Sequence, residues 1–322
     1  MSSRTSVIIV NYNGMPHVEV CVSSVLEQTY ANFEVIFVDN NSTDGSLDYA
    51  RQRFPSLIFL ANKENLGYAG GINAGLARAS GDYIAPLNID TQVTANWLRA
   101  MVAFLDDNPE AGAVTPKVLL FDDRARINAL GLDIHIAGLG FCRKLGKEDD
   151  VSLVAENVPG VSGCSYLIRR KILEEMGGAP EWSFMGNDDV IVSWLMRLMG
   201  YEIYCLPESI VFHKYSLKMS PEKLFRLEKN RQALLLATLK PVTLLLCLPI
   251  LLAIELLIII YSLLKGRPYL AAKFGALSSL WRERAVIRQR RARYQSLRKT
   301  SDFALLRRLR WNLAWSQLWG IR

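Results

Sequence analysis

Short apolar runs alternate with longer amphipathic stretches over the first part of the chain, and this alternation constrains the fold more than any other feature. The runs contain few charges, which is typical of strands buried on both faces of a sheet. The stretches between them are long enough for crossover helices, so the pattern predicts a mainly parallel, doubly wound α/β sheet. The expected strands are residues 6–10, 33–38, 57–61 and 83–87, and the expected helices are 18–28, 46–54 and 69–79.

The same reading extends to about residue 213, with one interruption. Residues 122–158 mix glycine, charge and short apolar pieces without a period, so we expect an irregular segment there, close to the site. Beyond the first helices, the pattern predicts helices at 94–107, 170–176 and 188–199 and strands at 113–117, 165–169, 202–205 and 209–213.

Residues 242–264 form an apolar stretch of 23 residues, long enough to cross a bilayer. Pro249 and Glu255 interrupt it, and Lys or Arg residues flank it on both sides, which conflicts with a simple single crossing. A buried core helix is one alternative. We favour a re-entrant or interfacial hairpin kinked at Pro249, which keeps both ends on the cytoplasmic side.

The tail that follows is strongly basic. Residues 265–322 hold 15 Lys and Arg against 2 Asp and Glu, whereas the whole chain has a net charge of +7. Such a tail is expected to face an anionic surface, either membrane lipid or nucleic acid, or to be simply a solvated basic helix. The preceding apolar stretch favours membrane lipid and no nucleic acid. The cations expected at the lipid surround Trp281 and Tyr294, and they are Arg282, Arg284, Arg288, Arg290, Arg291 and Arg293.

The chain therefore divides into three expected parts: a catalytic domain at 1–232, a membrane-associated segment at 233–264 and a helical tail at 265–322. Its five cysteines are scattered and lack a C-x-x-C pair, so neither a disulfide framework nor a zinc site is indicated. The N-terminus enters its first apolar run without a leader-like region. We expect a cell-membrane protein with a cytoplasmic catalytic domain.

Polar side chains follow the predicted strands, where ligands of such sheets gather. Asp39 and Asn40 begin a cluster of acceptors and turn formers that can bind a base and ribose, or simply cap the next helix. Asn88 and Asp90 are two apart, so their side chains point the same way in extended chain. Asp90 is a candidate ligand for Mg²⁺ or Mn²⁺, or else an exposed turn residue.

Three further features carry chemistry. The glycine-rich helix start at 65–75, with Gly67 near its beginning, permits close backbone approach to a diphosphate. Asp188 and Asp189 stand at a helix N-terminus, where carboxylates serve as caps or, near an acceptor hydroxyl, as a general base. His213 ends a strand, where an imidazole can ligate metal or contact phosphate.

Taken together, these pieces resemble the family 2 glycosyltransferases, whose fold is the GT-A fold. No single piece suffices, but their order and spacing are specific and cover most of residues 6–213. The segments that carry the resemblance are SVIIVNYNG at 6–14, VDNNSTDGS at 38–46, NLGYAGGINAG at 65–75, LNID at 87–90, VSGCSYLIRR at 161–170, NDDV with RLMGY at 187–201, and PESIVFH at 207–213.

The resemblance implies a nucleotide-sugar donor and a divalent metal. Asn11, Tyr12, Asp39 and Asn40 match positions around the nucleoside, while Gly67 and Asn73 match positions that hold the donor. Asn88 and Asp90 match the D-x-D-like metal motif, with an amide in the first position as in a rhamnosyltransferase-like branch, and His213 is a possible further ligand. When the family pattern is aligned back from Gly200 and Tyr201, its Glu-Asp pair falls on Asp188 and Asp189, so the resemblance makes Asp189 the base.

Two departures from the family pattern bear on the acceptor. Ile191 stands where this branch often has another Asp, and Gly178-Ala179-Pro180-Glu181 replaces the usual Gly-Phe-Asp-Glu. The Q-x-x-R-W motif of processive members is missing from the sequence, which favours the addition of a single sugar. The resemblance thus implies inverting, metal-dependent transfer to a hydroxyl of a glycan or lipid-linked saccharide.

Two alternatives stay open at the level of sequence. A sugar nucleotidylyltransferase shares this style of fold but has a glycine-rich loop where this chain has Asn11-Tyr12-Asn13-Gly14. A catalytically silent, membrane-anchored nucleotide-binding or scaffold protein is the other, because Asn88 and Ile191 both replace carboxylates of the family pattern.

Overall fold

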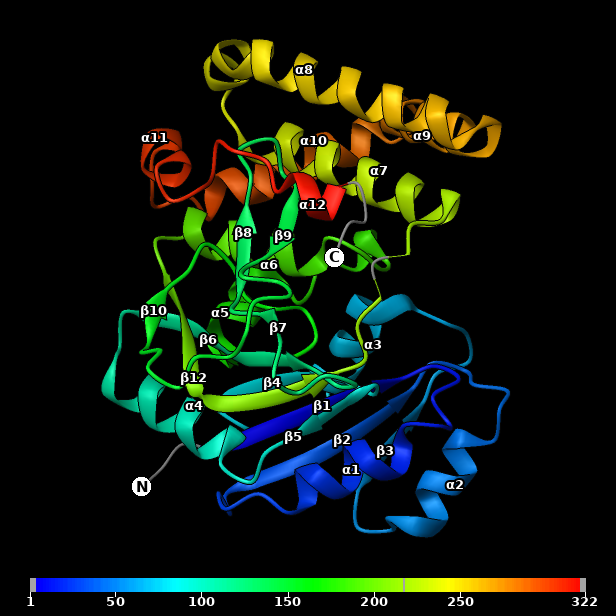
Figure 1. Ribbon diagram of the computed structural model, residues 1–322, viewed down its shortest axis with the longest axis vertical. Helices are drawn as coiled ribbons and strands as arrows, with labels where there is room; N and C mark the ends of the chain where they lie inside the picture. The colour runs from blue at the N-terminus through cyan, green and yellow to red at the C-terminus, as the bar shows by residue number, and fades with distance from the viewer. Residues whose placement is uncertain (1–3, 217, 319–322) are drawn as a thin grey trace.

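The computed structural model describes residues 4–216 and 218–318 of the chain. Its centre is a mixed sheet with the strand order β10-β12-β6-β11-β4-β1-β2-β3, to which β5 adds on β12 and β7 adds on β6 (Figure 1). The predicted α/β class is therefore confirmed. The first four strands are β1 (Thr5–Asn11), β2 (Phe33–Asp39), β3 (Ile58–Ala61) and β4 (Tyr83–Asn88).

These four strands are parallel, as the apolar runs predict. Asn11 lies beside Asp39, and Val10 lies beside Asn88, so the carboxyl ends of β1, β2 and β4 coincide at one edge of the sheet. The crossover helices are α1 (Val18–Leu26), α2 (Ser46–Arg53) and α3 (Gly67–Leu76).

The other half of the sheet is mixed. The short strand β11 (Leu167–Arg169) runs antiparallel between β4 and β6 (Ala111–Leu120), and β12 (Glu202–His213) then runs parallel to β6. The two strands expected at 202–205 and 209–213 are one, because the chain stays paired to β6 through a register shift between Leu206 and Ile210. The connecting elements are β5 (Thr91–Val93), α4 (Trp97–Asp107), α5 (Arg170–Met176), a short 3₁₀ turn (Glu181–Ser183) and α6 (Asp188–Leu198).

Residues 122–158 are more ordered than the sequence indicates. They contain β7 (Ile127–Ala129), which pairs with β6, and β10 (Glu156–Asn157), which pairs with β12. Between them β8 (Leu132–Ile134) and β9 (Gly140–Cys142) form a separate hairpin. Strands of two or three residues are too short to leave a visible period.

Alternating residues of the central strands face two apolar cores. Val7 and Ile9 pack with α1, α2 and α4 on one face, whereas Ile8 and Val10 pack with α3, α5 and α6 on the other. The result is a three-layer domain in which the helices of the two faces are drawn below and above the sheet (Figure 1). Both faces of the parallel strands are covered, as their continuous apolar sequence requires.

Helices from residue 221 onward form a further layer, drawn at the top of Figure 1. Side chains of α7 and α10 join the core around α6, so this layer packs on the sheet domain. The predicted boundary at residue 232 falls inside α7, and the division into three parts stays a prediction. The elements are α7 (Pro221–Thr238), α8 (Pro241–Lys265), α9 (Arg267–Arg282), α10 (Arg284–Ser296), α11 (Asp302–Leu306) and α12 (Trp315–Leu318).

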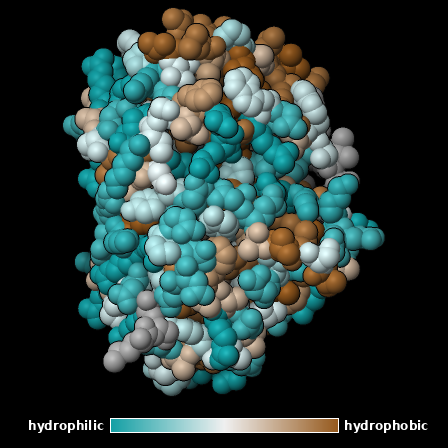
Figure 2. All heavy atoms as spheres, turned by 90° about the vertical axis from the view of Figure 1, so that its left-hand side faces the viewer, coloured by the Kyte–Doolittle hydropathy of each residue, from teal (hydrophilic) through white to brown (hydrophobic). Residues whose placement is uncertain are grey.

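The expected hairpin at Pro249 is wrong. Helix α8 continues without a break through Pro249, and it is the one helix within residues 4–216 and 218–318 that is long and apolar enough to cross a membrane. It is also not a core helix, since only Cys247, Ile254, Ile258 and Ser262 of it are buried. Its remaining face is exposed, and Figure 2 shows apolar side chains gathered at the top of the molecule, where α8 lies.

Half of the arginines that are expected to face lipid instead contact other parts of the protein. The Arg290 guanidinium lies 4.6 Å from the centre of the Trp182 ring, and the Arg291 guanidinium donates to the Leu239 carbonyl at 2.6 Å. Arg293 donates to a carbonyl at the end of α5, and the Tyr294 side chain is buried. The tail therefore returns onto the sheet domain. Arg282, Arg284 and Arg288 are exposed around Trp281, and Arg293 is exposed too although it bonds the end of α5.

Four charged side chains join α7, α8 and α9. Arg231 bonds Glu228 at 2.7 Å and also bonds Glu255, and Lys273 bonds the same two carboxylates. Three of the four side chains are almost completely buried, and Glu255 is one-quarter exposed. The glutamate that interrupts the apolar stretch thus faces the protein.

Candidate active site

The carboxyl ends of β1 and β2 form a buried hydrogen-bond cluster. The Asn11 amide donates to Asp39 Oδ1 at 2.7 Å and to the Ser46 hydroxyl at 2.8 Å. The second Asp39 oxygen accepts from the backbone N–H of Ser42 at 3.0 Å. Asp39 is thereby fixed at the edge of the sheet, next to Tyr12, whose side chain is half exposed.

Asn40 and Gly67 belong to a second cluster behind this edge. The Asn40 amide donates to the Gly67 carbonyl at 2.9 Å and accepts from Asn62 at 2.8 Å. Gly67 has a φ of +73°, and a Cβ there would lie 2.1 Å from the Phe184 carbonyl oxygen. Close packing against Phe184 thus explains why a glycine stands at position 67, and its role in holding the donor stays a prediction.

Asn73 lies apart from the strand ends. Its amide donates to the Ala179 carbonyl at 3.0 Å and to Glu181 at 2.7 Å, and its oxygen accepts from the Ala179 N–H. These partners belong to the segment at 179–181 and not to the strand ends. It ties α3 to the segment that leads into α6, and its donor role likewise stays a prediction.

Asp90 and His213 meet at the edge of the sheet. Because β5 pairs antiparallel with the end of β12, His213 Nε2 lies 3.5 Å from Asp90 Oδ1. The other ring nitrogen of His213 lies 3.0 Å from the Asn128 side-chain oxygen. Burial opposes the charged forms, but His213 lowers the pKa of Asp90, while Cys164 and Asp90 raise the pKa of His213 to about 10.

This pair fits a divalent cation that draws its other ligands from substrate. A carboxylate oxygen and an imidazole nitrogen are both ligands of Mn²⁺, and such ions are often held by few protein groups plus phosphates and water. Within residues 4–216 and 218–318 no group of three or more His, Cys, Asp or Glu side chains is placed to hold a metal. Asn88 directly precedes the pair at the end of β4.

Asp188 and Asp189 begin α6 in different surroundings. Asp188 accepts from the Gly186 N–H at 3.0 Å and so closes the turn before the helix. Asp189 accepts from the Val190 N–H at 2.8 Å. Burial raises the pKa of both carboxyls, and the neighbouring Asp188 charge adds to the effect on Asp189, whose pKa is about 7. Asp189 therefore has the acidity of a base that works near neutral pH.

A short connection joins the metal-ligand pair to Asp189. The Asn88 N–H donates to the Cys164 carbonyl at 2.9 Å, which places the turn at 163–164 against the end of β4. Gly163 then packs so closely on Asp189 that a Cβ there would lie 2.7 Å from its Oδ2. The two predicted groups of catalytic residues are thus neighbours across one turn.

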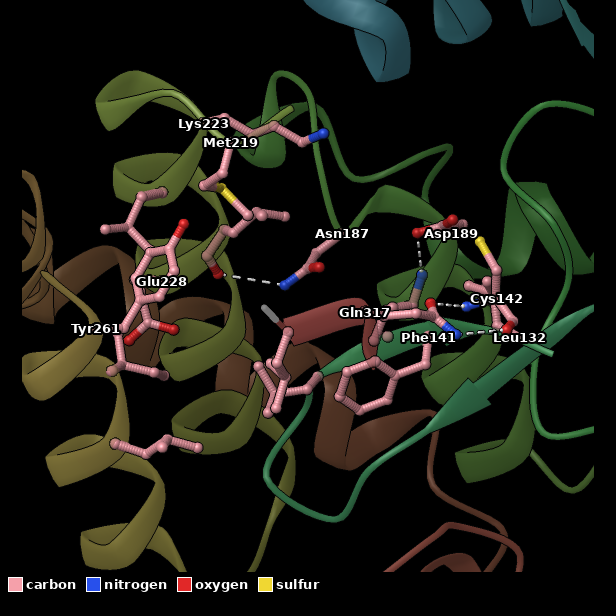
Figure 3. Close-up of a pocket in the computed structure, with 18 of the residues that line it drawn as sticks. Leu132, Phe141, Cys142, Asn187, Asp189, Met219, Lys223, Glu228, Tyr261 and Gln317 are labelled. Atoms are coloured by element: carbon pink, nitrogen blue, oxygen red, sulfur yellow. Dashed lines mark hydrogen bonds between the residues drawn. The ribbon is translucent and has the colours of Figure 1, made fainter. Parts of the chain in front are cut away.

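A cavity of about 310 Å³ opens beside Asp189 (Figure 3). In Figure 3 the Asp189 side chain lies at one side of the cavity and Tyr261 of α8 lies at the other. Tyr215 lines the cavity too, and its ring centre is 6.0 Å from that of His213. The cavity therefore reaches from the predicted chemistry to the apolar helix.

Several residues of this region escape the sequence analysis. Asn128 and Cys164 contact His213, yet both are far from it in sequence. Lys223 and Cys142 line the cavity, and burial raises the pKa of the Cys142 thiol to about 12, which leaves it unreactive. Cys164 lies in VSGCSY, a segment that carries the family resemblance, and Asn128 and Cys142 lie in the irregular segment that is expected close to the site.

Residues 6–177, just over half of the chain, match the family model described as Glycosyl transferase family 2. The chain belongs to this family. The predicted family is confirmed, and the alternative of a sugar nucleotidylyltransferase falls away.

Curated relatives share only part of their length with this chain. Over 225 residues it is 28% identical to a poly-beta-1,6-N-acetyl-D-glucosamine synthase of Staphylococcus aureus. The matched region covers 68% of this chain and 51% of the synthase. Over 112 residues it is 32% identical to an uncharacterized glycosyltransferase of Haemophilus influenzae, covering 34% of this chain and 35% of that protein. The chain thus spans 35% of the length of one relative and 51% of the length of the other.

Solved structures confirm the predicted GT-A fold. Mannosyltransferase PcManGT from Pyrobaculum calidifontis, in complex with GDP-Man and Mn²⁺, has a TM-score of 0.55 and 20% identity, covering 100% of this chain and 89% of that one. GalNAc-T7 with UDP, GalNAc and Mn²⁺ has a TM-score of 0.60 and 16% identity, covering 74% of this chain and 48% of that one. At these identities the likeness concerns the fold alone.

Proposed function

We propose that this protein transfers a single sugar from a nucleotide-sugar donor to a hydroxyl of a glycan or lipid-linked acceptor, with inversion and with a divalent metal. The observation that carries the proposal is the junction of Asp90, His213 and Asp189 through the turn at 163–164. A metal-ligand pair lies there next to a base of suitable acidity, and the base lines a cavity. The relatives and structural neighbours named above, which include complexes with GDP-Man and with UDP, support a nucleotide-sugar donor.

Each residue has a place in the proposed reaction. Asp39, held by Asn11, accepts hydrogen bonds from the nucleoside. Asp90 with His213 would hold a divalent metal, Mg²⁺ or Mn²⁺, which would supply positive charge opposite the diphosphate. Asp189 takes the proton of the acceptor hydroxyl, whose oxygen forms a bond to the anomeric carbon while the bond to the diphosphate breaks. One displacement inverts the configuration at that carbon.

The membrane part of the proposal rests on how α8 lies. It runs along the molecule beside α9, with its charged residue Glu255 turned inward and its apolar face outward (Figure 1). A helix packed lengthwise on charged neighbours suits the interface plane better than a crossing, because crossing would carry those neighbours into the hydrocarbon. We propose that α8 lies on the cytoplasmic face of a membrane with the sheet domain on the cytoplasmic side.

A thermal-shift screen of nucleotide sugars with Mn²⁺ or Mg²⁺ tests the proposal. A donor that binds only the native state raises the melting temperature by mass action, and we expect the rise to need the metal. Asp90→Ala removes the rise, whereas the matched control Asp107→Ala, an exposed carboxylate at the end of α4, keeps it.

A turnover assay with the donors that this screen identifies decides between an enzyme and a silent binding protein. Asn88 and Ile191 keep the silent alternative open. Metal-dependent donor binding without any released nucleoside diphosphate, across a panel of sugar acceptors, favours the silent protein. Donor binding that Asp90→Ala leaves unchanged contradicts the assigned metal site.

A further inference from the structure

We propose that the cavity beside Asp189 binds the lipid end of the acceptor, a long hydrocarbon chain that carries a phosphate. The inference rests on the proposed function, because it names the acceptor class of the same site. At about 310 Å³ the cavity is at the small end of the roughly 300–1,000 Å³ range of ligand pockets.

The walls of the cavity are mostly apolar and come from β8, β9, α6, α7, α8 and α12 and from the loops beside them. A nucleotide or a free sugar would leave its polar groups unpaired against such walls, whereas a hydrocarbon chain gains from them. The apolar residues are Leu132, Leu139, Phe141, Val190, Met219, Leu224, Leu227, Leu257, Ile258, Tyr261 and Leu318, with Tyr215 at the His213 side.

The charged side chains that line the cavity suit an acceptor that carries both a phosphate group and a hydroxyl group. Lys223 is exposed at the rim, and Figure 3 shows its amine extended over the cavity. Glu228 also lines the cavity, but Arg231 and Lys273 neutralise its carboxylate, so it does not repel an anion. With the phosphate at Lys223, a sugar attached to it presents its hydroxyl toward Asp189.

Helix α8 forms one wall of the cavity and carries an exposed apolar face beside it. Leu257 and Ile258 line it, while their neighbours Leu256 and Ile260 are 59% and 42% exposed on the outer face of the helix. A chain that leaves the cavity therefore meets an apolar surface rather than water. The exposed apolar face of α8 beside the cavity therefore favours a lipid-linked acceptor over a soluble glycan.

Photolabelling of the full chain in phosphatidylcholine nanodiscs tests the inference, with dodecyl phosphate that bears a diazirine at its far end as the probe. We expect labelled peptides from β9, α7 and α8 and competition by unlabelled dodecyl phosphate. Leu257→Trp, which fills the cavity, lowers labelling by about tenfold, since overfilled sites accept little extra volume. The matched control Leu256→Trp on the exposed face leaves it unchanged.

A second pair of variants tests the phosphate contact independently of cavity volume. Lys223→Gln weakens binding of dodecyl phosphate by about twofold to fivefold, the size expected for one exposed charge pair, and leaves binding of the diazirine-bearing dodecanol unaffected. Lys171→Gln, an exposed lysine of α5, changes neither probe.

The outcomes separate this inference from the proposed function. Equal loss of labelling in Leu257→Trp and Leu256→Trp, or labels outside the cavity, overturns the inference while metal-dependent donor binding persists. Labelling of the cavity in a protein that binds none of the nucleotide sugars overturns the proposed function instead.

Discussion

Asp189 is the residue on whose charge the proposed reaction depends. Its carboxylate must accept a proton, which an amide of the same shape does not do. We therefore expect Asp189→Asn to keep metal-dependent donor binding and to lower turnover by about two to four powers of ten, the usual contribution of a general base. Single-turnover kinetics and calorimetry measure the two effects separately. Turnover close to that of the wild-type protein would move the role to Asp188 or remove it from this pair.

The raised pKa of Asp189 also predicts a pH profile. Burial and then the Asp188 charge favour the protonated carboxyl, which is the inactive form of a base. The rate therefore rises with pH through about 7 and levels off above it. It falls again at a higher pH where a second essential group loses its proton. Asp188→Asn removes one of the two causes, so its rising limb shifts to lower pH. Initial rates from about pH 5 to about pH 9 check this, and an unshifted limb in Asp188→Asn contradicts it.

At the scale of elements, the four charges between α7, α8 and α9 decide how α8 is held. Removing one partner of a buried ion pair leaves a charge without compensation, which costs about 3–5 kcal/mol. Because Glu255 is one-quarter exposed, we expect Glu255→Gln to lower the free energy of unfolding by about 3 kcal/mol, at the low end of that range. Denaturant unfolding of the full chain in detergent measures it.

Two variants serve as controls for this cluster. Glu222→Gln removes an exposed pair with Arg226 on the same helix α7, which is worth at most about 1 kcal/mol. Glu255→Met combined with Lys273→Met removes one charge of each sign, so we expect it to be less destabilised than Glu255→Gln alone. A double variant that loses as much stability as the sum of its single changes would show that the charges do not act together.

The elements differ in how far their sequence predicts them. Residues 6–10, 33–38 and 83–87 read as parallel strands because burial on both faces demands an unbroken apolar run. The hairpin of β8 and β9 leaves no such signal, since each strand has three residues and its partner is supplied by tertiary contacts. At the site, Asp90 and His213 could be predicted because each follows or ends a strand. Asn128, which contacts His213, could not, because its sequence surroundings carry no period.

The continuous course of α8 has a similar explanation. Pro249 lacks an N–H and predicts a kink on local grounds. The helix nevertheless continues, because α9 packs beside it and Glu255 is anchored to Arg231 and Lys273. Tertiary packing overrides the local preference. Other tertiary contacts engage Arg290, Arg291 and Arg293 of α10, which corrects the expectation that the whole tail faces lipid.

At the scale of the whole molecule, the exposed face of α8 and the exposed part of the tail together determine how the protein meets a membrane. Leu245, Leu246 and Leu256 are each more than half exposed, and Trp281 of α9 is 71% exposed. Burying such side chains in lipid supplies an apolar term that salt does not screen, whereas exposed arginines supply a term that needs anionic lipid. We expect the full chain to bind neutral vesicles and to bind anionic ones more tightly.

The structure predicts which arginines supply the second term. The triple variant Arg282→Gln, Arg284→Gln, Arg288→Gln loses much of the preference for anionic vesicles, at up to about 1 kcal/mol for each charge. The matched triple variant Arg290→Gln, Arg291→Gln, Arg293→Gln keeps that preference and instead lowers the melting temperature, because these side chains hold the tail on Trp182, α7 and α5. Vesicle flotation at low and high salt, with thermal unfolding beside it, measures both. Equal loss of lipid preference in the two triple variants would mean that the tail leaves the sheet domain when it meets the membrane.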